Sequence, residues 1–255
     1  MFYIVYDLEF NQKDKHYTSN EYNNKTNLPF EIIQIGAVKL NEDFEIVSAF
    51  NSLIKPTVYT TIHPYIEELT KIKNTDVQDA PNFNVVINKF IDFIGNEPST
   101  LCVWGQADIS VLLQNLEFHN LSPLLLPKNY IDIQLHASKF FNAPSGSRIG
   151  LRNSIELLNI PINSNFHNAF NDAFYTSKVF KEIYSEKVKI QPISYVRNNN
   201  KLRKKSKEKI DFYNLYKQIE KMYNISLTSE EKEIIKLSYF MGKTNQFVKC
   251  DNSKE

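Results

Sequence analysis

The amino-acid sequence predicts an α/β fold, in which helices flank a mixed β-sheet and a small helical region follows. Residues 2–55 contain three runs rich in β-branched and aromatic residues, and a short polar turn joins the last two. Between residues 83 and 183, short apolar runs alternate with segments whose apolar residues recur at helical spacing. We therefore expect three antiparallel strands followed by parallel ones, with helices packed around the sheet.

The antiparallel part of the sheet is predicted near the N-terminus. Residues 2–6 (FYIVY) are typical of a short buried strand, and the polar stretch 11–28 is expected to be a loop. Residues 31–40 and 45–55 form two further strand-like runs, and the polar residues 41–43 between them indicate a β-hairpin.

Strands and helices are expected to alternate in the rest of the sheet domain. Residues 83–94 carry apolar side chains along one helical face. Buried strands are predicted at 101–104 and 130–133. Further helices are predicted at 65–70, 108–119, 134–141, 150–158 and 167–183.

The chain is expected to divide into a domain at residues 1–188, a basic linker at 189–209 and a small helical region at 210–255. Seven Lys or Arg lie within residues 197–209, which suits either a solvated linker or a surface that follows a phosphate backbone. Thr228 and Glu231 form a capping box for a helix at 229–240, which Gly242 is expected to end.

The composition bounds the class of protein. A chain of 255 residues with 42% hydrophobic residues can build a sizeable core, and its net charge of +1 does not by itself indicate a nucleic-acid partner. Cys102 and Cys250 are far apart and favour reduced thiols in a cytosolic protein. Neither a secretory signal nor an apolar stretch of about 18 residues occurs, so we expect a cytoplasmic protein without a membrane span.

Two carboxylates follow the first predicted strand. Alternation along the chain places Asp7 and Glu9 on the same face, with Leu8 on the other. Like charges this close repel one another unless a cation lies between them, so the pair suits a divalent metal ion. The alternative is that both side chains are simply solvated at the end of a strand.

Two more carboxylates and a histidine occur later in the chain. Asp108 lies at the start of a predicted helix, and His167 and Asp172 lie five residues apart on another. Taken singly, Asp108 could serve only to favour a helix N-terminus, and the other two could be a surface pair.

The ordered set of five residues resembles the DEDDh exonuclease family, which belongs to the DnaQ-like group with a ribonuclease H-like fold. The resemblance covers about residues 2–184 and also includes the following segments: Glu31-Ile-Ile-Gln-Ile-Gly-Ala-Val, Leu69-Thr70, Asp76-Val77-x2-Ala80-Pro81-x-Phe83, Trp104-Gly105-x2-Asp108 and His167-Asn168-Ala169-x2-Asp172-Ala173. A sister group has a tyrosine where this chain has Asn168, so the histidine branch is expected. The chain departs from the family where Thr70-Lys71 replaces a frequent Thr-Gly, and its loop after Glu9 is long.

The resemblance implies a catalytic centre with two divalent cations, Mg²⁺ or Mn²⁺. In this interpretation Asp7, Glu9 and Asp172 bind the cation that carries the attacking water, and Asp7 also binds the second cation. Asp108 completes the metal site through water, and His167 takes the proton from the attacking water. A histidine ordinarily has a pKa of about 6.5, which suits this role at neutral pH.

The expected substrate is the 3′ end of single-stranded DNA or RNA, from which nucleoside 5′-monophosphates are released. Leu8, Phe10, Leu69 and Thr70 are the candidate substrate-binding residues, with the backbone of Leu8 near the terminal 3′ hydroxyl; for Leu8, Phe10 and Leu69 plain core packing is the alternative. An alternative function is a catalytically inactive nucleic-acid-binding or scaffold module of the same fold. Residues 210–255 are a candidate surface for a protein partner or for self-association.

Overall fold

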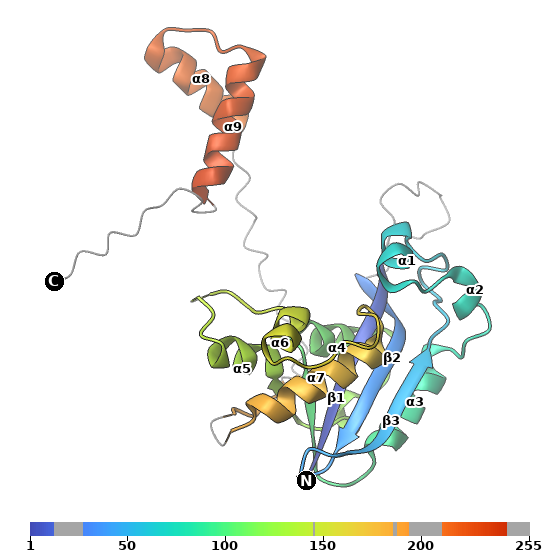
Figure 1. Cartoon of the computed structure of the whole chain (residues 1–255). Coiled ribbons are helices and arrows are strands. Elements are labelled where there is room, and N and C mark those ends of the chain that lie inside the picture. The colour runs from blue at the N-terminus through green and yellow to red at the C-terminus, as the bar shows by residue number, and fades with distance from the viewer. Residues whose placement is uncertain (13–27, 145, 186–187, 194–210, 244–255) are drawn as a thin grey trace, which may run out of the picture. The chain divides into compact units, whose positions relative to one another are not determined.

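The structure is a computed structural model that describes residues 1–255 apart from 13–27, 145, 186–187, 194–210 and 244–255 (Figure 1). It contains two compact units, Met1–Tyr195 and Val196–Glu255, and each is considered by itself. The basic segment 197–209 and most of the predicted loop at 11–28 lie outside the described residues. The predicted division into domain, linker and helical region stays a prediction.

The first unit is built on a six-stranded mixed sheet with the order β3-β2-β1-β4-β5-β6 (Figure 1). β1 pairs with β2 and β2 with β3 in antiparallel fashion, whereas β1–β4 and β4–β5 are parallel. The strands are β1 (Phe2–Gln12), β2 (Phe30–Leu40), β3 (Ile46–Leu53), β4 (Ser99–Val103), β5 (Asn129–Asp132) and β6 (Gln191–Pro192). This arrangement confirms the predicted α/β fold with antiparallel strands followed by parallel ones.

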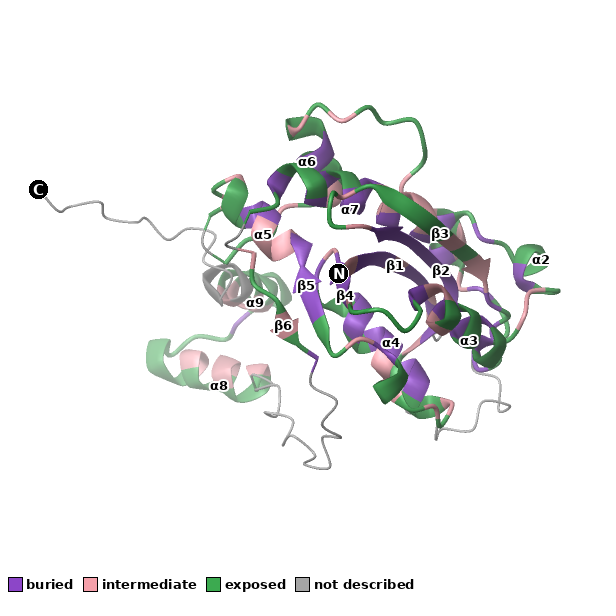
Figure 2. Ribbon diagram, turned by 90° about the horizontal axis from the view of Figure 1, so that it is seen from below, coloured by how far each residue is buried: buried purple, intermediate pink, exposed green. Residues whose placement is uncertain are grey.

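Helices cover both faces of this sheet. α3 and α4 lie against one face, and α6 and α7 lie over the other (Figure 2). The helices of this unit are α1 (Pro64–Thr70), α2 (Asn74–Val77), α3 (Phe83–Ile94), α4 (Ala107–Phe118), α5 (Ile133–Phe140), α6 (Leu151–Leu157) and α7 (Ala169–Ile183), with a 3-10 turn η1 at Pro123–Leu125. The helix predicted at 83–94 is confirmed over the same residues.

The alternation of β1 assigns its side chains to two separate cores. Ile4, Tyr6 and Leu8 pack with α3 and α4, whereas Tyr3 and Val5 pack with α5 and α7. Asp7 and Glu9 continue the second series, so their side chains leave the sheet on the side of α7.

Most element boundaries differ from the prediction by only one to three residues, and three differences are more informative. β1 runs on to Gln12, because the chain beyond Tyr6 stays paired with β2. α7 begins at Ala169, after an Asn168 cap, so His167 lies before the helix and not in it. β6 was not predicted; it is only two residues long and one of them is Pro192.

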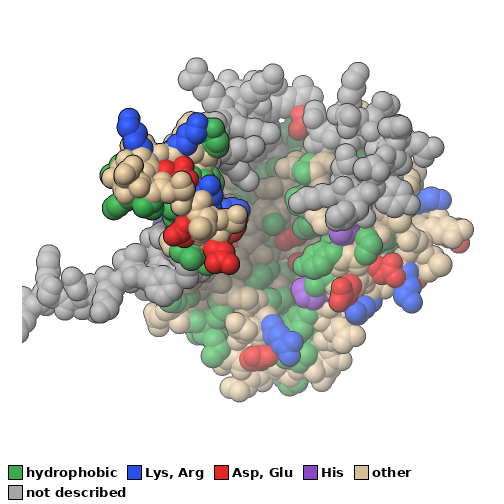
Figure 3. All heavy atoms as spheres, turned by 90° about the horizontal axis from the view of Figure 1, so that it is seen from above, with side chains coloured by type: hydrophobic (Ala, Val, Ile, Leu, Met, Phe, Trp, Pro, Cys, Tyr) green, Lys and Arg blue, Asp and Glu red, His purple; other side chains and the backbone are tan. Residues whose placement is uncertain are grey.

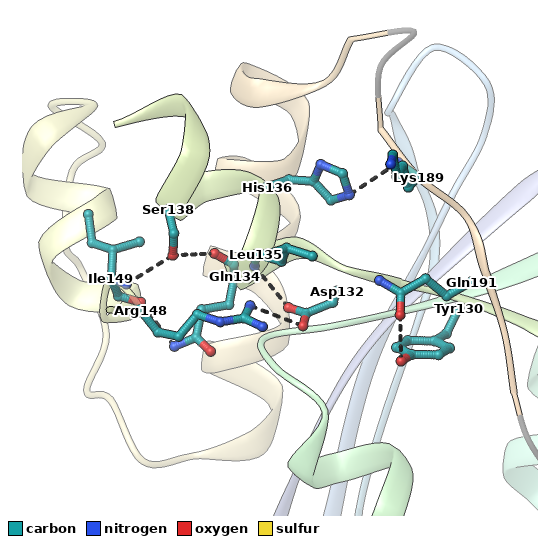
Figure 4. Close-up of polar contacts among 10 residues, drawn as sticks. All are labelled: Tyr130, Asp132, Gln134, Leu135, His136, Ser138, Arg148, Ile149, Lys189 and Gln191. Atoms are coloured by element: carbon teal, nitrogen blue, oxygen red, sulfur yellow. Dashed lines mark hydrogen bonds and ion pairs between the residues drawn. The ribbon is translucent and has the colours of Figure 1, made fainter. Parts of the chain in front are cut away.

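A buried carboxylate fixes the segment between α5 and α6. Asp132, which is fully buried, caps α5 by accepting from the backbone N–H of Leu135 at 2.9 Å. Its other oxygen accepts from Arg148 Nη1 at 3.1 Å, as Figure 4 shows. In the same view, Tyr130 donates to Gln191 Oε1 at 2.8 Å, which ties β6 to β5.

The second unit contains two described helices, α8 (Phe212–Tyr223) and α9 (Ser229–Lys243). The predicted capping box is confirmed, because Thr228 N–H donates to Glu231 Oε2 at 2.8 Å and Glu231 N–H donates to Thr228 Oγ1 at 3.3 Å. α9 continues through Gly242, so the predicted stop at that glycine is wrong. A single glycine costs a helix only about 1 kcal/mol. None of the helices in the described ranges is long and apolar enough to cross a membrane.

The residue after α1 has a left-handed backbone that favours glycine. Lys71 has φ 64°, and its N–H donates to the Glu67 carbonyl at 2.9 Å. Lys71→Gly is therefore expected to raise the free energy of unfolding by about 1 kcal/mol, measured by urea denaturation. The matched control is Lys89→Gly, at an exposed position inside α3, which should lower it by about 1 kcal/mol. A Lys71→Gly variant as destabilised as the control would contradict this account.

Candidate active site

Two carboxylates project from the far half of β1. Asp7 is half-buried and Glu9 is 9% exposed, and both lie on the α7 side of the sheet. Leu8 between them points into the opposite core and is 4% exposed. β1 stays paired with β2 from Asp7 to Glu9, so the regular alternation of the strand is kept here. Asp7 and Glu9 therefore lie next to one another on the same face of the sheet.

A third carboxylate comes from α7. Oxygens of Asp7, Glu9 and Asp172 all lie within 4.8 Å of one another. Asp172 Oδ2 accepts from the backbone N–H of His167 at 3.0 Å, whereas Asp172 Oδ1 is buried with no hydrogen-bond partner in the described chain. A buried carboxylate oxygen without a donor is costly, so this atom is suited to a cation.

Asp108 is the fourth acidic residue, in the first turn of α4, and it is 7% exposed. The backbone N–H groups of Asp108 itself and of Leu8 act to lower the pKa of its carboxyl, which places it beside β1. Seen from the end of the sheet where β1, β4 and β5 terminate, the first unit is hollowed and acidic side chains lie in the hollow (Figure 3).

These carboxyl groups have raised pKa values, and burial is the largest cause in each. The pKa of Asp7 is raised well above its ordinary value, further increased by Asp108, Glu9 and Asp172. The pKa of Glu9 is raised to about 8, with added repulsion from Asp172 and Asp108. Burial raises the pKa of Asp108 to about 7 and that of Asp172 to about 6, although hydrogen bonds from the backbone partly offset the effect.

The residues present fit a divalent metal site. Their ligand atoms are all carboxylate oxygens, which are the donors that Mg²⁺ and Mn²⁺ prefer. Among the described residues, no lysine or arginine forms an ion pair with any of the four carboxylates. A cation is therefore suited to neutralise the negative charge of the four carboxylates and to bind the unpartnered oxygen of Asp172.

His167 lies at the edge of this cluster. It is exposed, has φ 61°, and immediately precedes the cap of α7. Its backbone N–H is bound to Asp172, so the loop carrying the imidazole is tied to the third carboxylate. The five predicted catalytic residues thus lie on β1, on α4 and at the start of α7, with the four carboxylates close enough to shift one another's pKa.

Comparison with known proteins decides the family. The model of the exonuclease (RNase T) family matches residues 4–180, which is more than half of the chain. The chain belongs to the DnaQ-like exonuclease family.

Two curated relatives of this exonuclease chain extend the comparison. The probable 3'-5' exonuclease KapD of Bacillus subtilis (strain 168) is 27% identical over 184 residues, which are 72% of this chain and 85% of KapD. A PolC-type DNA polymerase III of Clostridium perfringens is 30% identical over 181 residues, which are 70% of this chain but only 11% of the polymerase.

Solved structures support the ribonuclease H-like fold of this exonuclease. The nuclease domain of 3'hExo, a DEDDh family member bound to rAMP, has a TM-score of 0.62 at 21% identity and covers 75% of this chain and 96% of that domain. A 3'-exonuclease that recognises a histone mRNA stem-loop has a TM-score of 0.61 at 20% identity, covering 75% of this chain and 73% of that one.

The candidate substrate-binding residues of the exonuclease have different surroundings. The Leu8 side chain is in the core, so only its backbone is left to meet a substrate. The Phe10 ring packs against Phe30 at 5.0 Å between centroids. Leu69 is half-buried, whereas the Thr70 hydroxyl donates to the Ile66 carbonyl at 2.8 Å. The binding role of all four stays a prediction.

Sequence reasoning missed the residues that seat α7 on the sheet. Gln34 accepts from the backbone N–H of Ala169 at 3.1 Å, and Gly36 contacts the same turn of the helix. The signal was present, because Gln34 and Gly36 are alternate residues in a strand that is mostly apolar and buried from Glu31 to Leu40.

Without metal, the free energy of unfolding is expected to fall as pH rises from about 6 to about 8. Glu9, Asp108 and Asp172 have folded-state pKa values above those of the unfolded chain, so the folded state binds more protons in this window. Their stabilising contribution is complete below the ordinary carboxyl pKa of about 4 and is lost as pH rises through the folded values. Saturating Mg²⁺ or Mn²⁺ should abolish this slope, because metal replaces the protons of the folded state and the unfolded carboxyls bind none in this window.

Urea midpoints measured across this window with EDTA or with metal check the expectation. His119 and His136 change the free energy of unfolding with the opposite sign, because burial lowers their pKa below 6.5. Their contribution therefore acts at the acidic end of this pH window and below it. A profile with EDTA that rises between about pH 7 and pH 8 would show that the carboxylates are not held as described.

Proposed function

We propose that the protein is a metal-dependent 3′–5′ exonuclease of the DEDDh type that removes nucleoside 5′-monophosphates from the 3′ end of a single nucleic-acid strand. The observation that carries the proposal is the convergence of four buried or half-buried carboxylates from β1, α4 and α7, one with an unpartnered buried oxygen. Family membership and the similarity to KapD give the reaction class.

The positions of the residues support the roles that the family resemblance implies. Asp7, Glu9 and Asp172 would hold one divalent cation and Asp7 a second, with Asp108 acting through water. When bound, two such cations would supply charge stabilisation at both the attacking and leaving oxygens. His167, exposed beside Asp172, would accept the proton of the attacking water. Asn168 follows this histidine, at the position where the sister group has tyrosine, which favours the histidine branch.

Substrate binding is proposed at the same end of the sheet. The backbone of Leu8 lies between the two acidic residues of β1 and would meet the terminal 3′ hydroxyl, with Phe10 beside it. Leu69 and Thr70, at the end of α1, would contact the terminal nucleotide. Whether the protein prefers DNA or RNA depends on its contacts to the 2′ position of the sugar.

The test is digestion of matched 5′-labelled single-stranded DNA and RNA oligomers with Mn²⁺, Mg²⁺ or EDTA, resolved on a sequencing gel. We expect a ladder that shortens from the 3′ end with metal and no ladder with EDTA, and the faster substrate identifies the preferred sugar. Binding of both oligomers without any ladder would instead favour the catalytically inactive module.

The helical second unit receives no catalytic role in this proposal. Several apolar side chains of its two helices are at least 60% exposed, namely Tyr213, Met222, Tyr223, Ile234 and Leu237. Such side chains suit contact with a protein partner or with a second copy of the chain, which stays a prediction.

A further inference from the structure

The first turn of α7 lies directly on β2. A Cβ atom added to Gly36 would come within 2.1 Å of the Phe170 backbone nitrogen and 2.2 Å of the Ala169 carbonyl carbon. Contacts this short are impossible, so a larger residue at position 36 would force the helix away from the sheet. The absence of a side chain at Gly36 therefore sets how closely α7 approaches.

A buried amide sets where the helix begins. Gln34 is 2% exposed, and its Oε1 accepts from the backbone N–H of Ala169 at 3.1 Å. Its Nε2 donates to Asn51 Oδ1 on β3 at 2.9 Å. The bond to Asn51 fixes the orientation of the amide, so that the oxygen of Gln34 faces the helix.

The other N–H groups of this helical turn are satisfied within the helix itself. Asn168 Oδ1 accepts from the N–H groups of Phe170 and Asn171, at 3.2 and 3.3 Å, and the Asn168 carbonyl accepts from Asp172. The bond from Ala169 to Gln34 is different, because it joins the turn to the sheet.

The register of the strands brings this contact to the acidic residues. Gln34 is paired with Glu9 across β1 and β2, and Gly36 is paired with Asp7. The two residue pairs of β1 and β2 that include Asp7 and Glu9 thus also include Gly36 and Gln34, which contact the start of α7. The same helix provides Asp172.

We propose that Gln34, oriented by Asn51, is a positioning residue that sets the start of α7, and with it Asp172 and His167, against Asp7 and Glu9. This inference rests on the proposed function. Misplacement of a reacting group by about 1 Å can cost about 100-fold in rate, and loss of supporting residues around a metal site typically costs about 10- to 100-fold.

The test compares Gln34→Met with Gln34→Glu in the full chain. Methionine fills the same space without an acceptor, so kcat should fall by about 10- to 100-fold and the Mn²⁺ concentration for half-maximal rate should rise about 10-fold or more. Glutamate keeps an acceptor for the N–H of Ala169, and the Asn51 amide can turn its Nδ2 toward it. Gln34→Glu should therefore recover most of the kcat lost in Gln34→Met, and KM for the oligomer should stay near the wild-type value in both.

Gln114→Met is the matched control, because Gln114 is exposed on α4, and it should behave as wild type. If Gln34→Met does not fold, as judged by circular dichroism, Asn51→Ala takes its place and should change kcat and Mn²⁺ dependence in the same direction. Wild-type kcat and Mn²⁺ dependence in the folded variant would overturn the inference, as would a Gln34→Glu variant as impaired as Gln34→Met. An inactive wild-type protein would instead overturn the proposed function itself.

Discussion

Replacing Asp7 by asparagine is expected to lower the rate of metal-dependent hydrolysis by roughly 10³- to 10⁵-fold. Bound metal ions contribute several kcal/mol of transition-state stabilisation, and about 1.4 kcal/mol corresponds to a factor of ten. Asp7 has the central position, because its pKa is raised by each of the other three carboxylates. Asparagine has nearly the same shape but only one neutral oxygen, so both proposed cations would lose a ligand.

The same substitution should stabilise the metal-free fold. The Asp7 carboxyl is repelled by its three acidic neighbours and loses solvation on burial, so its neutral replacement removes both costs. The urea midpoint at neutral pH with EDTA should rise, and the additional stabilisation by Mn²⁺ should shrink. A rate loss together with a gain in stability distinguishes loss of a metal ligand from loss of fold.

Asp92→Asn is the matched control for this variant. Asp92 is exposed on α3, so the same chemical change there should leave both the rate and the midpoint unchanged. An Asp7→Asn protein as active as the control would contradict the proposed assignment of the site.

The periodicity of the sequence was sufficient to predict most of the sheet and the helices around it. It underestimated β1, because Asp7, Glu9 and Asn11 belong to residue types that are infrequent or weakly favoured in strands. They are tolerated here since pairing with β2 satisfies the backbone, while the Asn11 side chain donates to the carbonyls of Tyr59 and Thr61 at 2.9 Å.

The start of α7 shows why local patterns mislead near a site. The apolar pattern predicts His167 within the helix, but the helix starts at Ala169, and Asn168 is a residue type that favours the cap position before it. His167 combines a left-handed backbone with an N–H bond to Asp172, and only the folded turn reveals this pair of features.

The order of the acidic residues indicated the candidate site, but not how its parts are held. The resemblance placed Asp7, Glu9, Asp108 and Asp172 in one set, and the structure brings the four carboxylates together. The contacts of Gln34 and Gly36 with the start of α7 join distant parts of the chain, and Gln34 and Ala169 are 135 positions apart. Local periodicity cannot reveal such contacts.

Replacing His167 by asparagine is expected to lower the rate of hydrolysis by about 10²- to 10⁴-fold, the usual contribution of a general base. Asparagine is chosen because it tolerates the left-handed backbone at this position, where alanine would add strain. Since the side chain is exposed and its N–H bond to Asp172 comes from the backbone, the fold and the carboxylates should be preserved.

Mn²⁺ binding, followed by calorimetry, separates the two roles open to this histidine. A general base predicts wild-type Mn²⁺ affinity with a large loss of kcat, because the cations are held by the carboxylates alone. A metal ligand predicts that affinity and rate fall together. The carboxylate oxygens that lie within 4.8 Å of one another come from Asp7, Glu9 and Asp172, and the histidine meets this group through its backbone, so we expect the first result.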